Sequence, residues 1–204
     1  MKFLYEKVAD GLAEQGYAVI GQFLSPSEVT GIRNLDAFKG GLLQFKKAGI
    51  GKQGEKRINE SIRGDYVQWI DRPGAGPELK VYLDRLDEMI SHVNQSLFLS
   101  LKDFEVHFTI YPAGSYYKRH LDQFKGDDHR RLSVILYLND GWKEEEGGQL
   151  RLHLAEGPVD VFPIAGQLVC FRSDKIEHEV RPATRDRLSV TGWVLDQFAE
   201  LKHL

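Results

Sequence analysis

The sequence predicts an α+β fold that is mainly β, a jelly roll of two packed sheets braced by N-terminal helices. Two observations predict it. Apolar residues recur at helical spacing in the first hundred residues, whereas from Glu105 onward they alternate with a period of two. Eight short alternating segments then follow one another with turn residues between them, as in a double-sheet sandwich. We expect one domain over 1–204, with helical support over about 1–100 and a jelly-roll core over about 105–196.

Three helices are predicted in the N-terminal half. The first covers Phe3 to Gln15 and is followed by a short strand, Tyr17 to Ile20. The second begins at Ser25-Pro26-Ser27-Glu28, with a serine cap, a proline in the first turn and an acid where the helix dipole favours it. The third runs from Pro77 to about Phe98, and its apolar residues form one stripe that we expect to pack on a sheet. The stripe consists of Leu79, Leu83, Leu86, Ile90, Val93 and Leu97.

The segment 49–57 is polar and rich in glycine, so it cannot bury a face and is predicted to be a loop. A strand entering the core is expected over 61–70. Glycine, asparagine and aspartate at turn positions divide the later residues into candidate strands. These strands are 105–111, 115–119, 131–138, 149–154, 158–162, 167–171, 177–181 and 187–195.

Composition narrows the function classes. The net charge of -3 provides no overall basic field for nucleic acid. The single cysteine, Cys170, excludes an intramolecular disulfide, and its apolar surroundings predict a buried, inert thiol. Charged residues interrupt the N-terminus too early for a signal peptide, and no apolar run approaches the length of a membrane span. We expect a cytoplasmic monomer that binds neither nucleic acid nor membrane.

A candidate metal site begins at His120-Leu121-Asp122. Residues i and i+2 of an extended chain point to the same side, so His120 and Asp122 can reach one ion. His178, in a later predicted strand, can supply a second imidazole. Two histidines and one carboxylate leave three positions of an octahedral ion open, as in non-haem Fe(II) oxygenases. A zinc hydrolase with an open coordination site accepts the same donors.

Arg187 is the candidate anion-binding residue. On a neighbouring antiparallel strand it would point where the metal points, at the head of a row that continues through Ser189, Thr191 and Trp193. A guanidinium facing inward is costly unless it binds an anion, and its planar fork suits a carboxylate. The alternative is a surface salt bridge to Asp186 or Asp174.

Several motifs follow one another in fixed order between residues 55 and 196. They are Ile62-Arg63-Gly64-Asp65, Tyr111-Pro112, Tyr117-x-Arg119-His120-x-Asp122, Tyr137-Leu138-Asn139, Gly147-Gly148-x-Leu150-Arg151, His178-Glu179-Val180, and Arg187 with Trp193 six positions later. In this order and spacing the sequence resembles the prolyl 4-hydroxylase branch of the Fe(II)- and 2-oxoglutarate-dependent oxygenases. The likeness is to the oxygen-sensing prolyl hydroxylase domain proteins and their bacterial relatives, which implies a double-stranded β-helix of cupin-like jelly-roll type.

The resemblance implies a role for each matching residue. His120, Asp122 and His178 would bind Fe(II), and Arg187 would pair with the 5-carboxylate of 2-oxoglutarate. Tyr137 would hydrogen-bond the same carboxylate, although its strand position also suits a core residue. The remaining roles are Tyr111 near the co-substrate, Trp193 as an apolar pocket wall, and Arg63, Asp65, Tyr117 and Arg119 as candidate substrate contacts, while Tyr111 and Tyr117 could equally be rim aromatics.

The activity implied is hydroxylation of a prolyl residue in a protein to 4-hydroxyproline. O2 would be consumed and 2-oxoglutarate converted to succinate and CO2, with ascorbate as a candidate reductant. A translation elongation factor is a candidate substrate, and the segment 49–65 is a candidate lid over a peptide or, alternatively, a solvated linker.

Three other functions stay open at this point. One is the same chemistry on free proline or another small molecule. Another is a sensor that binds metal and 2-oxoglutarate without turnover. The third is the zinc hydrolase on a cupin-like barrel.

Overall fold

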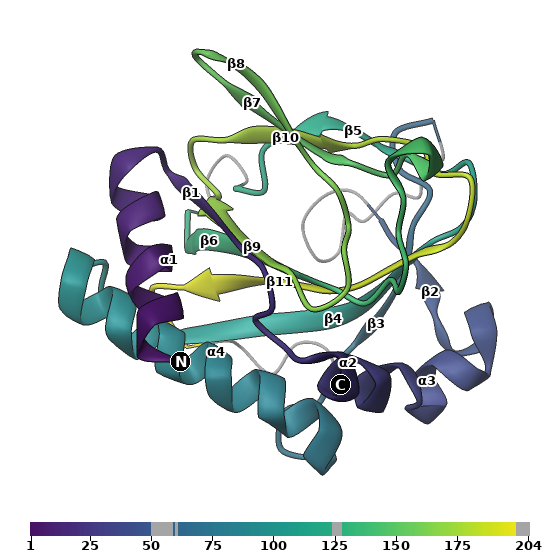
Figure 1. The fold of residues 1–204 in the computed structure, drawn as a ribbon, viewed down its shortest axis with the longest axis horizontal. Helices are drawn as coiled ribbons and strands as arrows, with labels where there is room; N and C mark the ends of the chain where they lie inside the picture. The colour runs from purple at the N-terminus through teal and green to yellow at the C-terminus, as the bar shows by residue number, and fades with distance from the viewer. Residues whose placement is uncertain (50–58, 60, 124–127, 199–204) are drawn as a thin grey trace.

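The computed structural model describes residues 1–49, 59, 61–123 and 128–198. Two sheets face each other, and the helices lie on the outer side of the larger sheet (Figure 1). The helices are α1 (Lys2–Glu14), α2 (Pro26–Arg33), α3 (Asp36–Lys39) and α4 (Pro77–Leu97), with 3-10 turns η1 (Gly41–Gln44) and η2 (Glu144–Glu146).

The larger sheet has the order β1-β9-β6-β11-β4-β3-β2, and the smaller sheet has the order β5-β10-β7-β8. Pairings between these strands are antiparallel. The strands of the larger sheet are β1 (Tyr17–Ile20), β9 (Leu168–Arg172), β6 (Arg130–Tyr137), β11 (Arg187–Leu195), β4 (Asp103–Tyr111), β3 (Tyr66–Trp69) and β2 (Lys46–Lys47). Those of the smaller sheet are β5 (Tyr117–His120), β10 (Glu177–Val180), β7 (Leu150–Leu154) and β8 (Gly157–Val161). The predicted jelly-roll fold braced by helices is confirmed.

The three predicted helices form where the sequence places them. Ser25 caps α2: its hydroxyl accepts from the Glu28 N–H, and the Glu28 carboxylate accepts from the Ser25 N–H. In α4 the predicted stripe is buried from Leu79 to Val93, whereas Leu97 is half-buried at the helix end. This face packs against the larger sheet in the main hydrophobic core, as expected.

The shorter elements differ more from expectation. Only Tyr66–Trp69 of the expected strand 61–70 is a strand, and the strand expected over 115–119 is Tyr117–His120. The short helix α3 and strand β2 were not predicted. Most of the predicted loop 49–57 and of the candidate lid 49–65 lies outside the described residues. The single domain over 1–204 stays a prediction.

Strand β11 shows how the larger sheet separates its two faces. Val190 and Val194 point to the helices and join the main core. Arg187 and Ser189, which alternate with them, are also buried but face the smaller sheet, where a second hydrophobic cluster lies. The polar row predicted for Arg187, Ser189, Thr191 and Trp193 therefore points between the two sheets.

One topological expectation was wrong. The strand after His178 was expected to pair with the strand that carries His178, but β10 and β11 belong to different sheets. Arg187 therefore faces the histidine across the sandwich rather than beside it. The short link 181–186 crosses from one sheet to the other, which a jelly roll requires of its connections.

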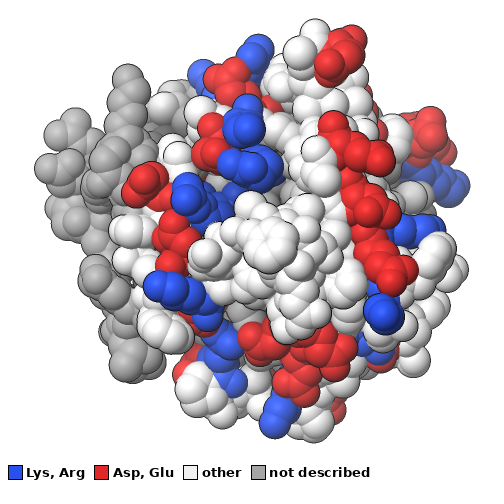
Figure 2. Space-filling view, turned by 90° about the vertical axis from the view of Figure 1, so that its left-hand side faces the viewer, with Lys and Arg blue, Asp and Glu red and all other residues white. Residues whose placement is uncertain are grey.

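On the face shown in Figure 2, basic and acidic side chains are interspersed around an uncharged area. The described residues of this face carry no continuous basic patch, in agreement with the net charge of -3. Over the residues that the structure describes, no helix combines the length and the apolar character needed to cross a membrane.

Candidate metal and co-substrate site

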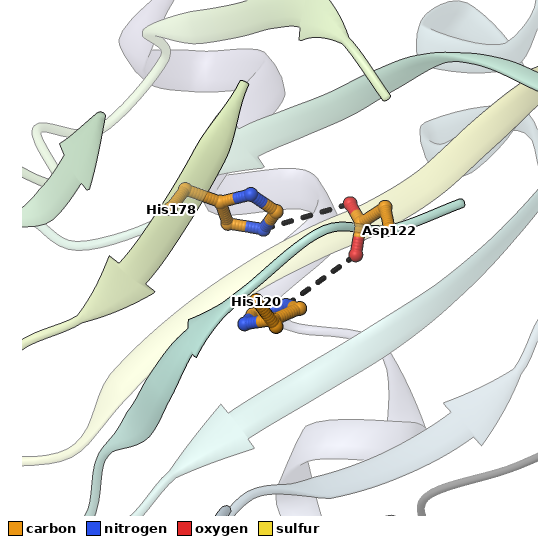
Figure 3. A group of neighbouring side chains, drawn as sticks. All are labelled: His120, Asp122 and His178. Atoms are coloured by element: carbon orange, nitrogen blue, oxygen red, sulfur yellow. Dashed lines mark ion pairs between the residues drawn. The ribbon is translucent and has the colours of Figure 1, made fainter. Parts of the chain in front are cut away.

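The His-x-Asp triplet and the second histidine meet at one end of the smaller sheet. His120 and His178 are register partners on β5 and β10, and Asp122 follows two residues after His120, where β5 has ended. Nε2 of His120 lies 3.4 Å from Oδ1 of Asp122, and Nε2 of His178 lies 3.6 Å from Oδ2 (Figure 3). All three donor atoms lie within 4.8 Å of one another, close enough to bind one ion.

Hydrogen bonds at the far side of each ring orient the two imidazoles. Nδ1 of His120 lies 2.7 Å from the carbonyl oxygen of Lys118, and Nδ1 of His178 lies 3.2 Å from that of Ile176. A carbonyl only accepts, so each Nδ1 carries the proton and each Nε2 keeps its lone pair. Burial lowers the pKa of His178 to about 4, which keeps this imidazole neutral and able to bind a cation.

Two serines that the sequence did not reveal support the carboxylate. The Ser133 hydroxyl donates to Oδ2 of Asp122 at 2.6 Å, and Ser173 contacts Ser133 at 2.8 Å. Burial by itself raises the pKa of Asp122, but His178, His120 and Ser133 hold it well below its usual range. Asp122 is therefore an anion. Ser133 could have been suspected only from its place on the inward face of β6.

A pocket of about 130 Å³ extends from the triad between the two sheets, and Arg187 lines it. Arg187 is only 1% exposed. Its Nε donates to the carbonyl oxygen of Gly148 at 3.0 Å, while Nη2 is buried and has no hydrogen-bond partner among the described residues. The alternative of a surface salt bridge is wrong: Asp174 pairs with Arg172, and Asp186 accepts from the Ala113 N–H.

The position of Gly148, whose carbonyl accepts from Arg187, requires a glycine. Its φ of +71° is a backbone conformation that side chains disfavour. A Cβ at this position would also lie 2.9 Å from the Trp142 ring and 3.0 Å from the Ala183 side chain. A larger residue at 148 would therefore strain the segment whose carbonyl accepts from Arg187.

Two tyrosines flank the Arg187 guanidinium. Its carbon lies 4.9 Å from the Tyr137 ring centre and 5.2 Å from that of Tyr111. Burial raises the pKa of Tyr137 and Tyr111, so both phenols stay protonated and can donate. The Tyr137 hydroxyl also has no partner among the described residues. A buried guanidinium N–H and a buried phenol that both lack an acceptor fit the carboxylate of a small anion.

The candidate substrate contacts fall into two groups. Arg63 binds Asp65 with two hydrogen bonds of 2.7 and 2.6 Å, and its guanidinium lies 4.2 Å from the centre of the Tyr117 ring. Tyr117 in turn stacks on His120, with ring centres 3.6 Å apart. These residues line the pocket beside the triad. Arg119 points elsewhere: it is exposed, pairs with Glu177 and does not line the pocket.

Trp193 also lines the pocket and lies six residues from Arg187 along β11. The Arg130 guanidinium lies 3.5 Å over its ring. Two further residues beside Trp193, namely Trp69 and His107, were missed by reasoning from the sequence. Their alternation on β3 and β4 matches an inward face, but nothing in the sequence shows which inward residues reach the cavity.

The fold and this donor set define a class of protein. Residues 106–195 match the family model of the 2OG-Fe(II) oxygenase superfamily. The chain is also 42% identical to a prolyl-4-hydroxylase from Pseudomonas putida, with a TM-score of 0.85 over 96% of this chain and 100% of that one. The chain belongs to the 2OG-Fe(II) oxygenase superfamily, whose members use Fe(II), 2-oxoglutarate and O2.

Particular relatives lie among prolyl hydroxylases. A Trichoplax adhaerens prolyl hydroxylase, solved with a hypoxia inducible factor oxygen degradation domain peptide fragment, is 30% identical with a TM-score of 0.84, covering 96% of this chain and 90% of that one. Egl nine homolog 1 from Homo sapiens and from Mus musculus is 28% identical over 211 residues, which cover 96% of this chain. The match covers 47% and 50% of those two proteins, so the chain spans about half the length of these relatives.

Proposed function

We propose that this chain hydroxylates a prolyl residue in a protein substrate to 4-hydroxyproline while 2-oxoglutarate is converted to succinate and CO2. One observation carries the proposal. A His-Asp-His donor set and a buried arginine that lacks an acceptor at Nη2 line the same pocket. The sequence identity of 42% and 30% with the prolyl hydroxylases of Pseudomonas putida and Trichoplax adhaerens supports prolyl hydroxylation as the reaction.

In this proposal His120, Asp122 and His178 hold Fe(II) through Nε2, a carboxylate oxygen and Nε2. Three protein donors leave positions for co-substrate and O2, and the bound metal supplies the oxidising chemistry. Arg187 and Tyr137 bind the far carboxylate of 2-oxoglutarate, and Tyr111 closes the pocket beside them. Burial of these groups excludes water and strengthens each charge-assisted hydrogen bond.

Substrate contacts are proposed for Arg63, Asp65 and Tyr117, which line the pocket beside the triad, with Trp193 as a wall of the pocket. Arg119 is exposed beside this region and could meet only a substrate that extends over the outer edge of β5. The proposal of a protein substrate with an accessible proline is supported by the Trichoplax relative, which was solved with a peptide. A translation elongation factor stays a candidate substrate, and oxygen sensing, ascorbate as reductant, a monomeric state and a cytoplasmic location stay predictions.

The test is a peptide screen. The protein is incubated in air with Fe(II), 2-oxoglutarate and proline-containing peptides, including elongation-factor peptides and the hypoxia inducible factor fragment. Mass spectrometry is expected to find one added oxygen on a prolyl residue, with succinate formed in equal amount. His178→Ala should abolish both products, whereas the matched control His153→Ala, on the outer side of β7, should retain them.

The competing functions give different results in the same screen. Hydroxylation of free proline without that of any peptide would overturn the protein-substrate proposal. Cleavage of a peptide by water that persists without O2 would indicate a hydrolase. Binding of 2-oxoglutarate without succinate under every condition would indicate a sensor.

A further inference from the structure

His107 is a buried titratable group in the pocket that the proposed chemistry does not use. It lies on the inward face of β4, is 3% exposed and lines the pocket. Its ring lies 4.9 Å from that of Trp69 and 5.6 Å from that of Trp193. An imidazole is costly among aromatic rings unless its nitrogens are hydrogen-bonded, so each nitrogen needs a partner.

One nitrogen of His107 is already bonded. Nδ1 lies 2.9 Å from the Thr109 hydroxyl and 3.4 Å from the carbonyl oxygen of Phe108. The carbonyl only accepts, so a proton on Nδ1 is the arrangement that serves both oxygens. Nε2 is then an acceptor, and it has no hydrogen bond to any of the described residues.

The ring is uncharged at neutral pH. Burial lowers the pKa of His107 to about 4, although Asp65 opposes this shift. Arg63 and Arg130, the nearby cations, also lower the pKa. In a neutral imidazole with a protonated Nδ1, the Nε2 lone pair faces the pocket. It can accept a hydrogen bond from an N–H or O–H group.

That donor cannot belong to the co-substrate. Arg187 is the register partner of Tyr111, whereas His107 lies four residues away on β4, opposite Thr191. Four residues of strand span roughly 13 Å. The carbon chain of 2-oxoglutarate has four C–C bonds of roughly 1.5 Å and so spans at most about 6 Å. When its far carboxylate lies at Arg187, 2-oxoglutarate is too short to reach His107. The donor to His107 therefore comes from the substrate.

We propose that His107 is a specificity-determining residue whose Nε2 accepts a hydrogen bond from a backbone N–H next to the target proline. This inference rests on the proposed function, because it requires a polypeptide substrate. A prolyl nitrogen within a chain carries no hydrogen, so the donor is the amide of a neighbouring residue. His107 thereby sets the position of the substrate polypeptide beside the rings of Trp69 and Trp193.

The enzyme variants His107→Leu and His107→Gln test the proposal with the best peptide of the screen as probe. Leucine removes the acceptor, and kcat/KM for the peptide should fall about tenfold. Glutamine restores an acceptor oxygen and should stay within about threefold of the wild type. The KM for 2-oxoglutarate and the bound iron should not change in either variant. The matched control His92→Leu, on α4 outside the pocket, should leave every value unchanged.

Peptide variants identify the donor. Each amide flanking the proline is replaced in turn by an ester, which removes one N–H and keeps the chain geometry. At one position the ester should lower kcat/KM about tenfold for the wild type and have no further effect in His107→Leu. Such coupling is specific to a direct contact and is not expected from a general loss of packing.

The outcomes separate this inference from the proposed function. Peptide hydroxylation that is unchanged in His107→Leu, or esters that show no coupling with this variant, would overturn the role of His107 alone. A raised KM for 2-oxoglutarate in both variants would assign His107 to the co-substrate site instead. A wild type that hydroxylates free proline and no peptide would overturn the proposed function and this inference with it.

Discussion

Two arginines line the same pocket but differ in how their charge is compensated. Arg63 forms two hydrogen bonds with Asp65, a carboxylate that is 1% exposed. Arg187 is 1% exposed and donates to the Gly148 carbonyl, yet its Nη2 has no acceptor among the described residues. A charge compensated by the protein stabilises the fold, whereas one left incomplete is suited to bind an anion. The difference separates an arginine whose charge the protein already compensates from one whose guanidinium is left to bind an anion.

Asp65→Ala should have the largest effect on stability, because it would leave the Arg63 guanidinium, only 14% exposed, without its carboxylate. We expect the free energy of unfolding to fall by about 3–5 kcal/mol, measured by urea titration. The exposed pair Arg151–Asp160 provides the matched control. Asp160→Ala should lower the free energy of unfolding by less than about 1 kcal/mol.

Arg187→Met makes the comparison sharper. It leaves no carboxylate unpaired, so the free energy of unfolding of the ligand-free protein should stay within about 1 kcal/mol of the wild type. A loss as large as that caused by Asp65→Ala would show that Arg187 stabilises the ligand-free fold as well.

Arg187→Lys should have the next largest effect, this time on binding. Lysine keeps the charge but not the planar fork, so the affinity for 2-oxoglutarate should fall by about 2–4 kcal/mol while iron stays bound. Calorimetric titration of the iron-loaded protein without O2 measures this loss. Arg33→Lys, in the exposed pair with Asp140, is the control and should bind like the wild type. Unchanged affinity in Arg187→Lys would remove Arg187 from its proposed role.

Ser133→Ala tests how a buried carboxylate is compensated, as the arginine variants test a buried guanidinium. Asp65 is compensated by an arginine, whereas Asp122 accepts from Ser133 and faces two imidazoles. Removing the hydroxyl should weaken Fe(II) binding by about 10- to 100-fold, as for other residues that orient a metal ligand. Competition with a chelator measures it. An affinity equal to that of the wild type would show that Asp122 needs no support.

Alternation along the chain predicted much of the site. In 187–195 every second residue was expected to face inward, and the structure places Arg187 and Trp193 in one pocket. The i, i+2 argument also brought His120 and Asp122 together, although β5 ends at His120 and a bend carries Asp122. Periodicity succeeds here because it reports which face of a strand a residue occupies.

Periodicity does not report which strand lies opposite. The contact of Ser133 with Ser173 joins β6 to a residue just beyond β9, forty positions away. The separation of β10 and β11 into two sheets and the placement of His107 beside two tryptophans depend on the same long-range packing. Arg119 was assigned from its motif, but its neighbour across the strand, Glu177, binds it outside the pocket. Such contacts follow from the tertiary structure and not from local sequence.

The smallest effect on binding is expected of Tyr137→Phe, at the end of the pocket that Arg187 lines. Burial raises the pKa of Tyr137, so its hydroxyl is a neutral donor, and it lacks an acceptor among the described residues. Losing one hydrogen bond to 2-oxoglutarate should reduce affinity by about 1 kcal/mol, roughly fivefold, in the same calorimetric titration. The ligand-free protein should be no less stable than the wild type, because the variant removes a buried group that has no partner there. A variant that loses stability without ligand and keeps its affinity would mean that the hydroxyl serves the fold, and that Arg187 alone binds the carboxylate.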